Sequence, residues 1–283
     1  MVYLITAATG NVGSLVVERL IARGDRPRIF VRDADKARAR YGDRVDIFTG
    51  DLGDAKTLRP ALEGADALFL VNSGPELAAL DELAAKTANA AGVKHVVKLS
   101  SYDAREQNVG TGVWHAAGEA AIRESGIPFT FVQPSGFMVN ALWWARSIKA
   151  DGVVRSATGD GKIPFIHSDD MADVAIQALT MPEYVGQSLP ITGPKALSYA
   201  DMTAKIGAAI GRALRFQPIS DEEERRKMVD SSDLPKIVTA HASIYRAIRE
   251  GRLAAVTDTV ERVLGRKPIT FDQWARENAA AFQ

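Results

Sequence analysis

The chain has 283 residues, of which 46% are hydrophobic and 25% are charged, and this composition is typical of a globular protein with a substantial core. Lys plus Arg and Asp plus Glu each total 35, so the formal net charge is zero and gives no general attraction to nucleic acid or anionic membranes. The absence of cysteine excludes disulfides, thiolate catalysis and cysteine-ligated metals. With no signal-peptide pattern and no apolar run of roughly 18 residues, a cytoplasmic enzyme or binding protein is expected.

Short β-branched runs alternate with longer Ala-rich segments over the first half of the chain. Several of the short runs are apolar on both sides of the pleat, which indicates a parallel sheet covered by helices on both faces. Right-handed crossovers then make an α/β, doubly wound parallel-sheet Rossmann fold. The expected strands are 2–6, 28–32, 45–49, 67–71, 95–99 and 130–133, and the expected helices are 12–22, 34–40, 55–62, 76–90 and 113–124.

The regular alternation weakens after Gln133. A Trp-containing helix is expected near 137–150, followed by a Gly-rich stretch and a helix capped by Asp169 or Asp170. A short strand in GQSLPITG and mostly helices from Leu197 complete the chain. We therefore expect a dinucleotide-binding Rossmann domain at 1–153, to which 168–193 returns. A smaller, mainly helical substrate-side region would comprise 154–167 and 194–283.

The first expected turn, TAATGNVG at 6–13, contains no long side chain. Gly10 and Gly13 have the spacing of the last two glycines in G-x-x-G-x-x-G, and Ala7 fills the first position, which is tolerable if its φ angle is negative. Gly10 would let the backbone approach a pyrophosphate, and Gly13 would let the next helix pack tightly on the sheet. The helix N-terminus would point N–H groups at the phosphates. A purely structural turn is the alternative, but strand–turn–helix is the context that the motif requires.

Arg32 ends the second expected strand, where NAD-selective folds usually carry an acidic residue for the ribose hydroxyls. An arginine there instead suits the 2′-phosphate of NADP, because its forked donors match phosphate oxygens. Lys36 and Arg38 add positive charge, although either could be exposed helix surface. Asp33 follows Arg32 directly, so the acidic alternative stays open. The sequence favours NADP(H), with NAD(H) possible.

Several motifs resemble the NmrA-like branch of atypical short-chain dehydrogenases over essentially the whole chain. They include TAATGNVG, FVRDADKA, GDL, FLVNS, LSS, WHAAGEAAIRESGIPFTFVQPSGFMVN, IHSDDMADVA, LPITGPKALSYADM and LGRKPITFDQWARENAAAF. That branch contains NAD(P)H-dependent quinone oxidoreductases, triphenylmethane-dye reductases and redox-sensing regulators that bind dinucleotide without turning it over. The resemblance therefore implies a Rossmann fold, a dinucleotide cofactor and one of these activities.

The resemblance also implies which residues meet the cofactor. Thr9 to Val12 would contact the pyrophosphate, and Asp51 and Leu52 would lie by the adenine. Asp51 could equally be a turn acid, and the segment 72–75 could be an ordinary loop. With the motif residues, the full set of expected cofactor contacts is Ala7, Thr9, Gly10, Asn11, Val12, Gly13, Arg32, Lys36, Asp51, Leu52, Val71, Asn72, Ser73, Ser100, Pro134, Ser135, Gly136 and Phe137.

The Tyr-x-x-x-Lys pair of standard short-chain dehydrogenases is absent. The corresponding helix offers His115 and Glu119, which at i and i+4 share a helix face, so a Glu-oriented imidazole is one candidate proton donor. A structural ion pair is the alternative. Tyr102 is the second candidate catalytic residue. An apolar wall for a flat acceptor is expected from Phe137, Met138, Trp143 and Trp144, whose alternative is core packing.

The missing acid pair bears on the substrate class. Reducing a simple ketone usually requires a well-placed acid, whereas quinones and cationic dyes delocalise the incoming electrons, so positioning against the nicotinamide would suffice. We expect an NAD(P)H-dependent oxidoreductase that transfers a hydride to a quinone-like or other conjugated aromatic acceptor. The alternatives are a redox-sensing dinucleotide-binding regulator without turnover and a reductase or isomerase of a specialised secondary metabolite.

The expected partner is a small aromatic or conjugated substrate, not nucleic acid or membrane, and the protein would be a monomer or homodimer. No metal is expected, because the four histidines form no close ligand pair.

Overall fold

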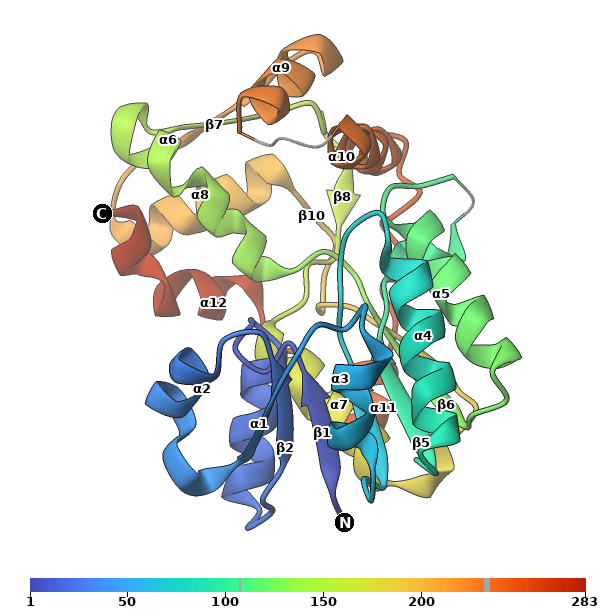
Figure 1. The fold of residues 1–283 in the computed structure, drawn as a ribbon. Helices are drawn as coiled ribbons and strands as arrows, with labels where there is room; N and C mark the ends of the chain where they lie inside the picture. The colour runs from blue at the N-terminus through green and yellow to red at the C-terminus, as the bar shows by residue number, and fades with distance from the viewer. Residues whose placement is uncertain (107, 232–234) are drawn as a thin grey trace.

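The computed structural model describes residues 1–106, 108–231 and 235–283. Its centre is a seven-stranded sheet of order β3–β2–β1–β4–β5–β6–β9, in which every neighbouring pair is parallel (Figure 1). The expected doubly wound Rossmann fold is confirmed. The strands are β1 (Tyr3–Thr6), β2 (Arg28–Val31), β3 (Asp46–Thr49), β4 (Ala67–Leu70), β5 (His95–Leu99), β6 (Phe129–Pro134) and β9 (Ser188–Ile191).

Helices cover both faces of the sheet, and the pleat divides the apolar side chains between them. In β1, for example, Tyr3 and Ile5 join one core cluster and Leu4 joins the other. The first face is covered by α1 (Gly13–Ala22), α2 (Ala34–Tyr41), α7 (Ser168–Thr180) and α11 (Thr259–Leu264). The second is covered by α3 (Ala55–Leu62), α4 (Leu77–Ala90) and α5 (Gly112–Glu124).

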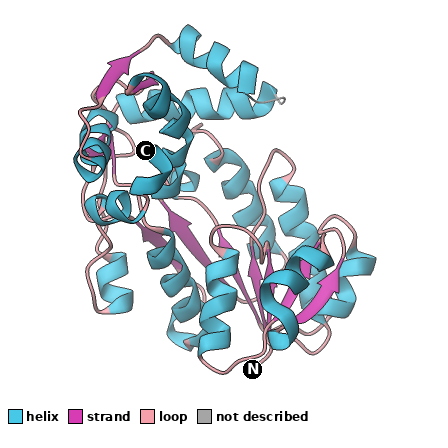
Figure 2. Ribbon diagram, turned by 90° about the vertical axis from the view of Figure 1, so that its left-hand side faces the viewer, coloured by secondary structure: helices cyan, strands magenta, loops and turns pink. Residues whose placement is uncertain are grey.

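A smaller, mainly helical region lies beyond the carboxyl ends of the strands and has its own core (Figures 1 and 2). Two short sheets brace it: β7 (Val153–Ser156) pairs with β11 (Arg215–Pro218), and β8 (Lys162–Ile163) pairs with β10 (Leu197–Ser198). Its helices are η3 (Met138–Trp144, a 3₁₀ helix), α6 (Ala145–Asp151), α8 (Tyr199–Ile210), α9 (Asp221–Ser231), α10 (Pro235–Arg249) and α12 (Phe271–Glu277). This arrangement places a second layer over the sheet edge where Rossmann ligands bind.

Two local expectations change in the structure. The helix expected at 137–150 is a 3₁₀ segment followed by an α-helix, and its buried Met138, Ala141 and Ile148 pack in the core of the smaller region. The cap of α7 is His167, whose ring nitrogen accepts a hydrogen bond from the Asp169 backbone N–H, so the expectation of an aspartate cap was wrong. Among the described residues, the helices are all too short or too polar to cross a membrane.

Candidate cofactor and acceptor site

The first turn after β1 is held in a left-handed conformation at Ala7. Its φ angle is +48°, so the negative φ that would make an alanine readily tolerable here is not present. The Ala7 carbonyl accepts the Gly10 N–H at 2.9 Å, which closes the turn that redirects the chain into α1. A left-handed alanine costs roughly 1–2 kcal/mol, and this is the position at which the motif ordinarily has glycine. The turn therefore keeps the geometry of the motif despite the substituted residue.

Gly13 allows α1 to approach this turn. A Cβ atom at Gly13 would lie 2.3 Å from the carbonyl oxygen of Ala7, a distance that no side chain tolerates. The other side of the turn is fixed by the buried Tyr41 hydroxyl, which donates to the carbonyl oxygen of Ala8 at 2.5 Å. Among the described residues no side chain caps α1, and the Ser14 N–H donates to the Gly10 carbonyl at 3.1 Å. The uncapped helix N-terminus is a place where an anion can bind.

A groove of about 320 Å³ runs past this helix N-terminus, lined by Thr9, Gly10, Asn11 and Ser14 on one side. His167, Asp169 and Glu277 line the opposite side, and His167 Nε2 lies 3.2 Å from the Glu277 carboxylate. Bare backbone, a helix N-terminus and small side chains are what a dinucleotide pyrophosphate requires, so the groove fits this group. The contribution of α12 was not foreseen, because Glu277 lies more than 260 residues after the glycine turn in the sequence.

Ion pairs hold the segments around the groove together. Arg19 on α1 binds Asp169 at 2.6 Å and Asp173 at 2.5 Å on α7. Arg266 binds Asp173 and the fully buried Asp170, each at 2.6 Å. These ion pairs fix α7 between the glycine turn and the C-terminal segment that carries α12.

At the adenosine end, the carboxylate of Asp33 is used as a helix cap. Its Oδ1 accepts the Lys36 backbone N–H at 2.9 Å, which begins α2. Arg32 and Lys36 have exposed side chains, and no hydrogen bond or ion pair of these side chains is present among the described residues. Asp51 accepts the Gly53 N–H at 2.7 Å, as a turn acid does. The positive groups at the end of β2 are therefore free to meet a ligand.

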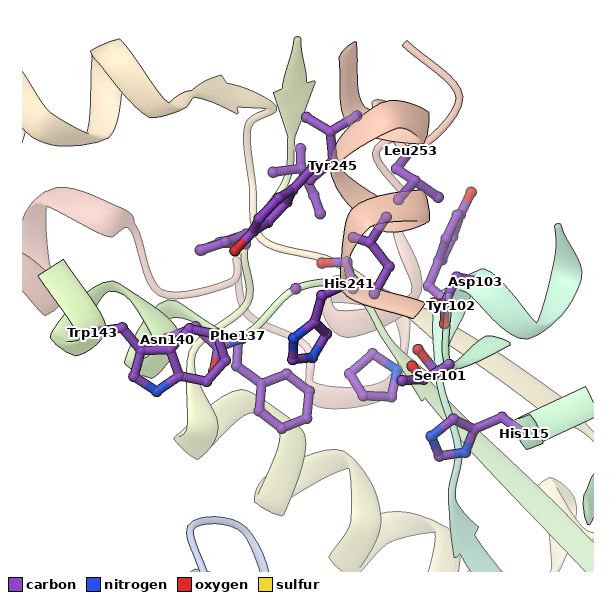
Figure 3. A pocket seen from close by; sticks show the side chains of 18 of the residues that line it. Ser101, Tyr102, Asp103, His115, Phe137, Asn140, Trp143, His241, Tyr245 and Leu253 are labelled. Carbon is purple, nitrogen blue, oxygen red and sulfur yellow. The ribbon is translucent and has the colours of Figure 1, made fainter. Parts of the chain in front are cut away.

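A cavity of about 390 Å³ lies at the carboxyl ends of β4, β5 and β6, under the smaller region (Figure 3). It brings together residues expected on cofactor and catalytic grounds, namely Ser73, Ser100, Tyr102, His115, Pro134, Ser135, Gly136 and Phe137. Trp143 and Trp144 of the expected apolar wall also line it, whereas Met138 is buried in the core instead. Lining residues that the sequence did not single out include Asn140, Tyr199, His241, Tyr245 and Leu253.

The expected pairing of His115 with Glu119 was wrong. Glu119 is buried, and its Oε1 accepts hydrogen bonds from the Ser100 hydroxyl at 2.5 Å and from the Gln133 amide at 2.8 Å. His115 Nδ1 has no hydrogen-bond partner among the described residues. Burial, with the nearby Lys98 ammonium acting in the same direction, lowers the pKa of His115 to about 3. A neutral imidazole cannot donate a proton as an acid near pH 7, so the geometry disfavours this role.

A fully buried ion pair lies beneath the cavity and was not anticipated. Lys98 on β5 contacts Asp81 on α4, and both side chains are 0% exposed. Asn72 donates its amide to Asp81 at 2.7 Å, which ties the loop after β4 to the pair. Burial raises the pKa of Asp81 and lowers that of Lys98. A lysine inside the apolar run HVVKL was the available signal, because such a residue is almost never buried without a partner.

The expected contacts Val12, Leu52 and Val71 lie in the segments that follow the carboxyl ends of β1, β3 and β4. The Val71 N–H donates to the Thr6 hydroxyl at 2.7 Å, which joins the ends of β4 and β1. Leu52 is half-buried against the second core cluster, and Val12 is buried in the first. The roles proposed for these residues toward a cofactor stay predictions.

Known proteins are similar to this chain over its whole length. A family model described as NAD(P)H-binding matches residues 7–182. An NAD(P)H azoreductase of Xenophilus azovorans is 37% identical over 99% of this chain and 98% of its own. A (4-alkanoyl-5-oxo-2,5-dihydrofuran-3-yl)methyl phosphate reductase of Streptomyces griseus is 36% identical over 99% and 98%.

The fold is also similar to a solved NADPH-dependent quinone oxidoreductase of Escherichia coli. The TM-score is 0.88 at 24% identity, with 98% of this chain and 99% of that chain covered. The chain therefore belongs to the NAD(P)H-binding family.

Proposed function

We propose that the protein is an NAD(P)H-dependent reductase that passes a hydride to a quinone-like or other conjugated acceptor. The observation that carries the proposal is the aromatic-walled cavity at the carboxyl ends of β4, β5 and β6. It lies on the same sheet edge as the glycine turn, where Rossmann folds place the two ends of a dinucleotide. The 37% identical relative is named as an azoreductase, which acts on a conjugated acceptor of this type.

The bound nicotinamide supplies the hydride, and the chain supplies position and a dry surrounding. Phe137, Trp143 and Tyr245 offer flat faces against which a conjugated ring can stack. Holding the ring against the cofactor converts a bimolecular encounter into an oriented one. For a quinone, the acceptor and NAD(P)H with one proton give the hydroquinone and NAD(P)⁺. Tyr102, whose hydroxyl-bearing ring lines the cavity, is the proposed source of that proton.

We also propose that the residues at the end of β2 select NADPH over NADH. Asp33 is engaged as the cap of α2, so its carboxylate is not held ready for ribose hydroxyls, while Arg32 is exposed beside it. An exposed guanidinium at the end of β2 suits a 2′-phosphate. We further propose a cytoplasmic monomer or homodimer that binds small molecules and not nucleic acid.

Titration of both nucleotides by fluorescence tests the cofactor part. Arg32→Gln should weaken NADPH binding by about tenfold or more, the value of one charge-assisted contact, and leave NADH binding unchanged. Arg38→Gln is the matched control, since Arg38 is a nearby exposed arginine on α2 whose guanidinium is already paired with Asp35 at 3.4 Å. Equal losses for the two nucleotides in Arg32→Gln would show that Arg32 does not read the 2′-phosphate.

An acceptor panel tests the reaction. Oxidation of NADPH would be followed with a naphthoquinone, an azo dye, a triarylmethane dye and a conjugated butenolide. The butenolide is included because the Streptomyces griseus relative is named for reducing a conjugated dihydrofuranone phosphate. Tight NADPH binding without oxidation by any acceptor would refute the reductase and favour the redox-sensing regulator.

A further inference from the structure

A second cavity of about 770 Å³ lies beside the first, between α6, β7, α9 and α10. Trp143, Trp144, His241 and Tyr245 line both cavities, so these rings form a shared wall. The Trp143 and His241 rings are 6.3 Å apart between centroids, and both point into the first cavity in Figure 3. Trp143 is 67% exposed, so core packing does not hold its indole in place.

The charges of this second cavity leave one cation without a partner. Asp151 binds Arg155 at 2.6 Å, and Glu224 binds Lys227 at 3.0 Å, so these four groups neutralise one another in pairs. Arg146 on α6 also lines the cavity, and no acid within the described chain pairs with it. The cavity therefore carries a net positive charge that Arg146 provides.

A buried hydroxyl in the same cavity also lacks a partner. Ser156 at the end of β7 is 2% exposed, and its Oγ makes no hydrogen bond to any described residue. Leaving a buried hydroxyl unsatisfied costs about 1–3 kcal/mol, so a partner for Ser156 Oγ that enters from the cavity would be favourable. An anion can accept hydrogen bonds from a hydroxyl and a guanidinium together.

We propose that the second cavity binds the far end of an elongated acceptor that ends in a carboxylate, sulfonate or phosphate group. The conjugated part of this acceptor would lie in the first cavity and pass the shared wall at Trp143 and His241. Arg146 and Ser156 would bind the anionic end. This inference rests on the proposed reductase function for the first cavity, and it makes the second cavity the determinant of acceptor length and charge.

The test compares two azobenzenes that differ only in charge, 4-phenylazobenzoate and 4-phenylazobenzamide, with NADPH as donor. The ratio of kcat/KM for the benzoate over the benzamide should fall about tenfold in Arg146→Gln and recover in part in Arg146→Lys. Ser156→Ala should lower the same ratio by roughly threefold. Both losses should appear in KM and not in kcat, because the contact is far from the reacting atoms.

Lys149→Gln is the control, since Lys149 is an exposed cation on the same helix and lines neither cavity. It should leave the ratio unchanged. An unchanged ratio in Arg146→Gln, or an equal loss in Lys149→Gln, would overturn the proposal.

Failure of the reductase itself can be distinguished from failure of this site. If neither azobenzene is reduced, binding of both to the NADPH-loaded protein would be measured by quenching of tryptophan fluorescence. A preference for the benzoate that Arg146→Gln removes would support the second cavity even then. Equal affinities for the two compounds in the unmodified protein would refute it.

Discussion

Replacing Gly13 by alanine should push α1 away from the first strand. The added Cβ would lie 2.3 Å from the carbonyl oxygen of Ala7, 2.9 Å from its carbonyl carbon and 3.1 Å from the carbonyl oxygen of Thr6. All three atoms are backbone, so no rotamer change relieves the clash. The helix must move by about 1 Å, since non-bonded heavy atoms are stable only near 3.5 Å or beyond.

That movement disturbs the buried face of α1, on which Val16, Val17 and Leu20 are each 0% exposed. Overpacking of this kind costs about 3 kcal/mol, which for a chain of this size lowers Tm by about 6 °C or more. NADPH binding should weaken as well, because the helix N-terminus leaves its place beside the groove. Differential scanning fluorimetry and a fluorescence titration measure the two effects.

Gly10→Ala separates stability from binding. Its Cβ would meet only Ala7 atoms, the nearest at 3.2 Å, so the free energy of unfolding should change by less than about 1 kcal/mol. Because Gly10 lines the groove, the methyl group should still weaken NADPH binding. An unchanged Tm in Gly13→Ala, or unchanged NADPH affinity in Gly10→Ala, would refute this interpretation of the turn.

Three other predictions follow from buried and cavity-lining groups. Burial lowers the pKa of His95 to about 4 and of His115 to about 3, whereas the unfolded chain takes up protons near pH 6.5. The stabilisation from these neutral histidines should therefore be fully present above pH 6.5. As the pH falls below 6.5, the free energy of unfolding measured by urea titration should decrease by about 1.4 kcal/mol per pH unit for each histidine. In His95→Gln, an undiminished slope would contradict this. Asp81→Asn leaves the Lys98 ammonium buried and unpaired, so the free energy of unfolding measured by urea denaturation should fall by about 3 kcal/mol. The double variant Asp81→Leu with Lys98→Met removes both charges and should recover most of this loss. Tyr102→Phe should lower kcat for a quinone by about tenfold, less than general acids usually contribute, and leave the NADPH affinity unchanged; loss of NADPH affinity would instead make Tyr102 a cofactor contact.

The position of the glycine turn could be predicted from the local sequence, but its backbone conformation could not. Small residues after a strand and before a helix predicted the turn, and the structure has it at that position. The sequence did not reveal the positive φ angle at Ala7, because spacing alone does not indicate the direction in which a turn closes. That direction follows from the hydrogen bond between Ala7 and Gly10 and from the close approach of Gly13.

The partners of the buried polar groups could not be predicted from the sequence. His115 and Glu119 have the spacing of a helix pair, yet Ser100 on one loop and Gln133 on β6 compete successfully for the carboxylate. A helical period predicts which residues share a face, but it does not predict which neighbours that face will meet. The charge state of His115 then depends on burial beneath another layer of the protein.

By itself, the sequence determined the Rossmann architecture, the position of the glycine turn and the carboxyl-edge segments that line the first cavity. Each depends on contacts between residues close in the chain, or on the apolar pattern of single strands. The tertiary structure alone decided the partners of Lys98 and Glu119, the neutral state of His115 and the second cavity. Those features arise where α4 and α5 pack on β5 and β6, and where α6, β7, α9 and α10 surround the second cavity. Their energies depend on burial and on partners, which exist only once the layers have packed.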